Sequence, residues 1–173
     1  MREGVGPRLR RQNERNGGHW AVGRKRAAAV GTATEWWGAL PPRCTGTITW
    51  QPNDCWPVTS WAAVDGDGRR KPLLYALRAA NAQRLATIQP HSDGLSLTVV
   101  NDSDEEWNAH FTVTRRAFDG GMLAIETWDA LIPARGVARH RIGVDITTPT
   151  DPRAELIRAT SSSLKADWFF EEA

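Results

Sequence analysis

This 173-residue sequence has no long apolar stretch, little excess of charge of either sign and only two cysteines. Each of these features excludes a class of protein. No run approaches the ~18 apolar residues that a membrane helix requires, so we expect no membrane span and no membrane partner. The amino terminus is basic, but no apolar segment follows it, so it does not resemble a secretory signal and a cytoplasmic location is expected. A net charge of +2, with 40% hydrophobic and 24% charged residues, is typical of a globular protein.

Cysteine and histidine offer no obvious cross-link or ligand set. Cys44 and Cys55 are separated by a largely extended stretch, which would hold their Cα atoms beyond the ~7 Å limit for a disulfide. We therefore expect two free thiols in a reducing compartment. His91, His110 and His140 are dispersed without metal-ligand spacing, so the sequence predicts no metal site and no cofactor.

The basic residues concentrate at the amino terminus. Residues 1–35 contain eight Lys or Arg and three acidic residues, whereas residues 36–173 contain 14 and 17. A basic arm can bind nucleic acid, but only Trp20 is available there for stacking and no recognised motif is present. We favour a solvated or poorly folded segment over a nucleic-acid partner, with a polyanion-binding protein as an alternative.

Two helices are predicted in residues 1–83. Residues 19–35 are rich in alanine and favour a helix, although Gly23 and Gly31 weaken that prediction. The second helix, over residues 72–82, begins with proline in its first turn and repeats apolar residues at helical spacing.

A single strand is predicted between these helices. Residues 45–50 are rich in β-branched side chains and predict a buried strand, and residues 51–59 contain the proline, asparagine and aspartate of a loop. Strand, loop and helix together form a βα unit. Because a parallel sheet needs several strands covered on both faces, one βα unit in residues 1–83 cannot complete a fold alone. The sequence therefore predicts the remnant of a larger α/β domain.

From about residue 84 the apolar residues recur with a period of two. The predicted strands, separated by turn residues, lie at residues 95–99, 107–114, 122–127, 137–144, 154–159 and 164–170. Several short strands without helical periodicity predict an antiparallel β-sandwich of immunoglobulin type over residues 84–173. Its expected core includes Leu97, Val99, Trp107, Phe111 and Val113.

Residues 43–61 carry a resemblance to a known family. In this segment a run of small residues is followed by aromatic and polar residues in a fixed order: Trp50-Gln51-Pro52-Asn53-Asp54, Trp56-Pro57 and Ser60-Trp61. This series is similar to the last barrel strand and following loop of family 2 glycoside hydrolases, most of all the bacterial β-mannosidases. The likeness continues through residues 64–76 and the sandwich, is patchy over residues 19–42 and is very weak over residues 1–18.

The resemblance implies a longer parent with a (β/α)8 barrel, whose active site lies at the carboxyl ends of the strands. Its implied reaction is retaining hydrolysis of terminal β-D-mannosides by two glutamates about 5 Å apart. In the family these glutamates follow strands four and seven, whereas the segment here resembles strand eight. Neither Glu14, in a polar stretch, nor Glu35 matches the surroundings of either glutamate. We therefore assign no catalytic residue and expect the chain alone to be inactive.

Three residues are candidates for substrate binding: Trp50, Asn53 and Asp54. Trp50 ends the predicted strand, where an indole could stack on a pyranose, or could instead pack at the barrel rim. Asn53 and Asp54 could bond sugar hydroxyls, hold the catalytic glutamates in position, or form a turn. The partner implied for the complete parent is a β-mannoside or manno-oligosaccharide.

The neighbours of these candidates are expected to have structural roles. We expect Trp56, Ser60 and Trp61 to pack beneath the loop, and Asp65 and Lys71 to be structural. Pro52 departs from the family, which usually has an apolar residue such as leucine there. Proline lacks an N–H and disfavours helical geometry in the residue before it. A non-catalytic carbohydrate-binding or interaction module that uses exposed tryptophans is the alternative function.

Overall fold

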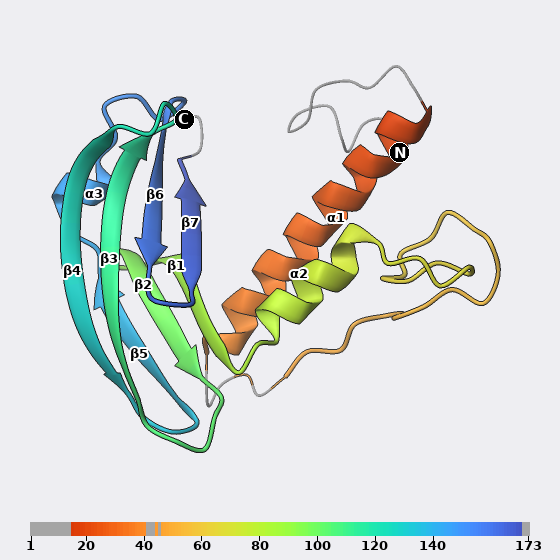
Figure 1. The fold of residues 1–173 in the computed structure, drawn as a ribbon, viewed down its shortest axis with the longest axis horizontal. Coiled ribbons are helices and arrows are strands. Elements are labelled where there is room, and N and C mark those ends of the chain that lie inside the picture. The colour runs from red at the N-terminus through yellow and green to blue at the C-terminus, as the bar shows by residue number, and fades with distance from the viewer. Residues whose placement is uncertain (1–14, 41–43, 45, 171–173) are drawn as a thin grey trace. The chain divides into compact units, whose positions relative to one another are not determined.

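The computed structural model describes residues 15–40, 44 and 46–170, and these fall into two compact units. The first comprises the described residues up to 38 together with 44–81, and the second comprises 39, 40 and 82–170. Each unit is described by itself (Figure 1). No helix in the described part of the chain is both long enough and apolar enough to span a membrane.

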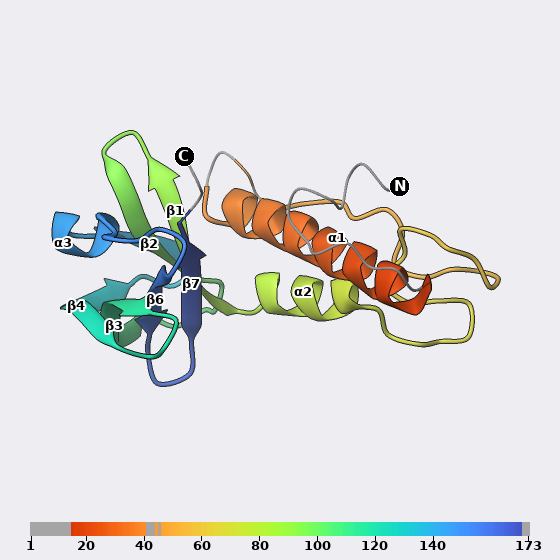
Figure 2. The same ribbon diagram turned by 90° about the horizontal axis from the view of Figure 1, so that it is seen from above.

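The first unit contains two helices that pack side by side, α1 (Arg15–Gly38) and α2 (Pro72–Ala80) (Figures 1 and 2). Both predicted helices are confirmed, and α1 is longer than expected at each end. Gly31 is buried, and a Cβ built on it would lie 3.4 Å from the Cβ of Ala76. The glycine that weakens the helix in isolation therefore lets the two backbones approach closely.

The predicted buried strand at residues 45–50 is wrong for the part that is described. Residues 46–50 form no strand, and the Ile48 and Trp50 side chains are 98% and 84% exposed. Thr45 lies outside the described residues. β-branched residues favour a strand only when a neighbouring strand accepts their backbone hydrogen bonds and covers their faces. The described residues of this unit supply only isolated bridges, which join Val64 to Asn53 and Arg70.

The second unit consists of two antiparallel sheets. The three-stranded sheet has the order β1 (Arg84–His91), β2 (Gly94–Asn101), β5 (Gly136–Arg141). The four-stranded sheet has the order β4 (Met122–Ile132), β3 (Trp107–Ala117), β6 (Glu155–Thr160), β7 (Lys165–Phe169). A single helical turn, α3 (Val144–Thr147), follows β5.

Six of the seven strands match the period-two segments, and two details differ. The strand predicted at residues 137–144 ends at Arg141, because the chain turns into α3. β1 is the strand that alternation does not reveal, since its residues 86–89 are buried on both faces and include Thr87 and Gln89.

The core of the second unit lies between its two sheets. All five residues expected there are buried, with Leu97, Val99, Phe111 and Val113 completely inaccessible and Trp107 9% exposed. The Phe111 ring meets the edge of Trp107, with centroids 6.2 Å apart, and stacks on Trp128 at 5.8 Å. Aromatic contacts of this kind contribute beyond the burial of their area.

A buried asparagine joins two turns at one end of the sandwich. Asn101, at the end of β2, is inaccessible to solvent. Its amide nitrogen donates to the carbonyl oxygens of Glu105, Ile132 and Pro133 at 2.8, 3.3 and 3.0 Å. Its side-chain oxygen accepts from the Ser103 N–H at 3.2 Å and hydroxyl at 2.6 Å. The loop after β2 and the turn after β4 therefore share one polar anchor.

We predict that Asn101→Ala lowers the free energy of unfolding by about 3 kcal/mol, because it removes a buried side chain whose hydrogen bonds join two turns and deprives the buried Ile132 carbonyl of this donor. Asn108→Ala, at an exposed position on β3, is the matched control and should change it by less than about 0.5 kcal/mol. Urea unfolding followed by circular dichroism measures both. Equal stability of the two variants would contradict an anchoring role for Asn101.

Candidate functional site

The three candidate residues lie on the loop that precedes α2, but they differ in exposure. The indole of Trp50 projects into solvent and Asn53 is also exposed, whereas Asp54 is only 6% exposed. The structure therefore leaves two of these side chains exposed to solvent and directs the third inward. The Asn53 side-chain nitrogen lies 3.4 Å from the carbonyl oxygen of Asp54.

The base of this loop is held by backbone hydrogen bonds. The carbonyl oxygen of Pro52 accepts from the N–H groups of Ala63 and Val64 at 3.0 and 2.9 Å, and Asp54 N–H donates to the Val64 carbonyl at 3.0 Å. Lys71 N–H donates to the Ala63 carbonyl at 2.9 Å, immediately before α2 begins. Pro52 takes part only through its carbonyl, so its missing N–H removes none of these bonds.

The carboxylate of Asp54 is engaged at both oxygens. Lys71 Nζ donates to Oδ2 at 2.8 Å, and Gln51 Nε2 donates to Oδ1 at 3.3 Å. The same ammonium also donates to Ser60 Oγ at 3.2 Å. Hydrogen bonding, first from Lys71 and then from Ser60, lowers the pKa of the Asp54 carboxyl below its ordinary value, although burial opposes this effect. Asp54 is therefore held as a charged carboxylate.

An arginine from α1 reaches the same loop. Arg26 Nη1 donates to the carbonyl oxygen of Ser60, and its guanidinium lies 4.6 Å from the ring centroid of Trp61. Burial lowers the pKa of Arg26, and the charge of Asp54 opposes that shift. The composition of the basic segment gave no reason to single out this residue, because its partners lie more than thirty positions away. The sequence also gave no indication that Lys71 is the partner of Asp54.

Two tryptophans of the loop do not have the expected packing role. Trp56 and Trp61 are 66% and 70% exposed, so the prediction that they pack beneath the loop is wrong. The neighbouring small residues Ala62 and Ala63 are buried instead, with exposures of 0% and 1%. Ser60 is half-buried, as a partner of Lys71.

Asp65 lies in the turn after the loop and has the structural role that we expected of it. Its Oδ1 accepts from the backbone N–H groups of Asp67 and Arg69 at 3.0 and 2.8 Å. A Cβ on Gly66 would lie 2.5 Å from the carbonyl carbon of Trp56, so only glycine fits beneath the loop tip. The backbone at Gly66 therefore packs directly against the backbone at Trp56, whose side chain faces solvent.

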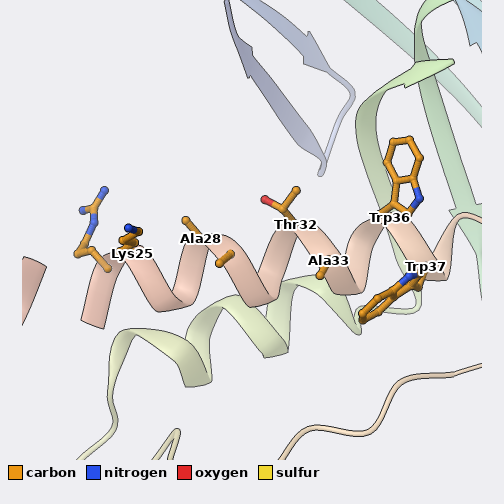
Figure 3. Close-up of a pocket in the computed structure, with 8 residues that line it drawn as sticks. Lys25, Ala28, Thr32, Ala33, Trp36 and Trp37 are labelled. Carbon is orange, nitrogen blue, oxygen red and sulfur yellow. The ribbon is translucent and has the colours of Figure 1, made fainter. Parts of the chain in front are cut away.

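Two shallow grooves follow α1, and neither contains the three candidate residues. Figure 3 shows the first, with Trp36 and Trp37 pointing to different sides at the carboxyl end of the helix. Small side chains line its middle, and basic residues lie at its other end. The second groove lies between α1 and α2 and is lined by four alanines together with larger residues that include Trp20 and Tyr75. Neither groove brings together acidic groups suited to acid–base chemistry.

The described residues contain no group of three or more His, Cys, Asp or Glu that could hold a metal ion. Cys44 and Cys55 are free thiols. Of the two glutamates considered as mimics of catalytic residues, Glu14 lies outside the described residues and Glu35 is half-buried within α1.

Comparison with known proteins identifies the class of protein that the chain resembles. No protein-family profile matches it. Among curated proteins, β-mannosidase B of Thermothelomyces thermophilus is 30% identical over 102 residues, which are 55% of this chain and 12% of that protein. β-Mannosidase B of Emericella nidulans is 56% identical over 51 residues, 29% of this chain and 6% of that protein. The chain thus spans only a small part of the curated relatives it matches.

Solved glycosidases share the fold. The β-D-mannosidase of Dictyoglomus thermophilum superimposes with a TM-score of 0.85 at 22% identity, covering 96% of this chain and 21% of that one. The exo-chitosanase CsxA of Amycolatopsis orientalis gives a TM-score of 0.64 at 16% identity, covering 88% and 19%. The chain is therefore similar to a portion of a glycosidase. More narrowly, the resemblance to the β-mannosidases predicted from its sequence is confirmed.

Acidification is expected to loosen the loop. Because the folded pKa of Asp54 lies below its unfolded value of about 3.9, its stabilisation is fully present well above that value and is lost as the pH falls through the folded pKa. Hydrogen exchange at the Asp54 and Val64 amides, corrected for intrinsic rates, should report this loss below about pH 4. Asp54→Asn should remove most of the pH dependence, and an unchanged profile in that variant would contradict the assignment.

Proposed function

We propose that the chain is a portion of a retaining β-mannosidase-type glycosidase of family 2. In this proposal residues 1–83 correspond to the end of a (β/α)8 barrel, with the segment around Trp50 at the rim of the sugar pocket, and residues 84–173 to an immunoglobulin-like sandwich. The observation that carries the proposal is the sequence likeness to β-mannosidases, joined to the series of residues from Trp50 to Trp61. The two antiparallel sheets and the fold likeness to a β-D-mannosidase support it.

The chemistry of such an enzyme divides between this chain and the rest of the parent. A retaining glycosidase uses one carboxylic acid to protonate the leaving oxygen and a carboxylate about 5 Å away to attack the anomeric carbon. We assign neither group to this chain. Its contribution is recognition of a terminal β-mannosyl unit, with the Trp50 indole stacking on the sugar ring and the Asn53 amide within reach of its hydroxyls. The exposure of both side chains supports this assignment.

A second function is favoured by the exposed tryptophans. Trp50, Trp56 and Trp61 are each more than half exposed and lie within twelve residues of one another in sequence. Aromatic faces on a supported loop are suited to binding carbohydrate without hydrolysing it. A non-catalytic carbohydrate-binding module would bind manno-oligosaccharides as this isolated chain, with no other part of an enzyme.

The purified chain should not hydrolyse a chromogenic β-mannoside, because none of its residues is assigned as the carboxylic acid or the carboxylate that the reaction requires. p-Nitrophenyl β-D-mannopyranoside, assayed at high protein concentration, tests this expectation. Turnover that disappears in Glu14→Gln would contradict it and would give that glutamate a catalytic role.

In a full-length relative with the same series of residues, replacement of the tryptophan equivalent to Trp50 by alanine should lower kcat/KM about ten- to a hundred-fold. The estimate takes the loss of one stacking contact as about 1–3 kcal/mol, by analogy with bases on aromatic side chains. Steady-state kinetics and thermal unfolding should be measured together. Unchanged activity with a large drop in Tm would make Trp50 a packing residue instead.

A further inference from the structure

We propose that the Asp54–Lys71 ion pair is a positioning device that fixes Trp50 and Asn53 for sugar binding, and that Asp54 itself does not contact the sugar. This inference rests on the proposed carbohydrate-binding role of the loop, which it extends by separating the residues that touch ligand from those that hold them. Asp54 is a positioning residue, and Lys71, Ser60 and Gln51 are its partners.

The Asp54 carboxylate is directed into the interior of the loop base. The Asp54 side chain is 1% exposed, and its two oxygens already accept hydrogen bonds from Lys71 and Gln51. A sugar hydroxyl would have to displace one of these donors and open the loop base. Asn53, the preceding residue, is exposed and meets no such obstacle. Asn53 forms an isolated β-bridge with Val64, and adjacent residues of β-type backbone point to opposite sides, consistent with one facing solvent and the other the interior.

A series of contacts links the ion pair to the residue next to Trp50. Gln51 follows Trp50 directly, and its amide is held by Asp54 Oδ1. Lys71 is the residue at the amino-terminal cap of α2, and its carbonyl oxygen accepts from Leu74 N–H at 3.0 Å. A chain of contacts thus runs from the first turn of α2 through Lys71 and Asp54 to the residue beside the exposed indole.

Asp54 also balances the charge of two partly buried cations. Lys71 retains 23% side-chain exposure and Arg26 is also half-buried, so Asp54 is the anion that compensates cations held partly away from water. Removing either member of a buried pair leaves an uncompensated charge, which is more disruptive than removing both. The two single variants should therefore have similar effects, and the double variant should be no worse than either.

The experiment uses the full chain and four variants: Asp54→Asn, Lys71→Met, the double variant, and Asp67→Asn as control. Asp67 is a half-exposed carboxylate of the same segment, paired with Arg69 at 3.1 Å, so its replacement changes the net charge as Asp54→Asn does. Two readouts are needed: the NMR resonances and relaxation of the Trp50 indole N–H and Asn53 amide without ligand, and a titration with β-1,4-mannotriose.

Without ligand, Asp54→Asn and Lys71→Met should move and broaden the Trp50 and Asn53 signals alike, whereas Asp67→Asn should leave them in place. With mannotriose, both single variants should weaken binding at least ten-fold, the double variant should be no weaker than either, and Asp67→Asn should stay within two-fold. Unchanged ligand-free signals in Asp54→Asn would overturn the proposal.

The remaining outcomes separate the alternatives. If Asp54 is a sugar ligand, Lys71→Met will keep or improve affinity while Asp54→Asn loses it, and the proposal fails. If the pair only stabilises the fold, thermal midpoints will fall while the Trp50 signal and the affinity of the folded fraction stay unchanged, and the proposal again fails. If the wild-type chain does not bind mannotriose but the ligand-free signals move as predicted, the positioning role stands and the second proposed function, a carbohydrate-binding module that acts alone, fails.

Discussion

The buried carboxylate of Asp54 is the constraint on which the first unit's loop depends. A charge with 1% exposure persists only if cations and donors around it replace water, and here Lys71 and Gln51 do so directly. Ser60 shares the same ammonium, and Arg26 from α1 is bonded to the Ser60 carbonyl. Helix α1, the loop and the start of α2 are consequently tied together by one polar cluster rather than by a large apolar core.

In the second unit, an apolar core holds the sheets together, whereas buried polar groups again fix the turns. Glu155 accepts from the backbone N–H of Asp151 at 2.9 Å and pairs with Arg115 at 2.6 Å. Burial alone would raise the pKa of Glu155, but these hydrogen bonds and the arginine charge together lower it. In both units the carboxylate stays charged because donors are already placed around it, so each turn or loop has one defined geometry.

The features that sequence predicts well are those specified by neighbouring residues. Alternation along β3 and the helical spacing after Pro72 both depend only on local pattern, and both are found. Features that depend on distant partners are missed. The β-branched run before Trp50 predicts a strand, but the described residues provide no neighbouring strand to complete it. For the site, the resemblance to β-mannosidases identifies Trp50, Asn53 and Asp54 as candidate residues. It does not reveal that Asp54 points inward, because that follows from Lys71, seventeen positions away.

The structure joins a rigid base to exposed aromatic side chains, and this combination limits what the loop can do alone. Trp50, Trp56 and Trp61 are exposed, whereas Asp54 and Lys71 at the base of the loop are paired with each other. Hydrolysis requires a carboxylic acid and a carboxylate at a set separation on either side of the scissile bond. In the proposed function, the loop would recognise and orient the sugar, and the reacting groups would come from other elements of the parent. A loop base fixed by internal ion pairing would then keep the stacking residue aligned with groups that the loop does not itself contain.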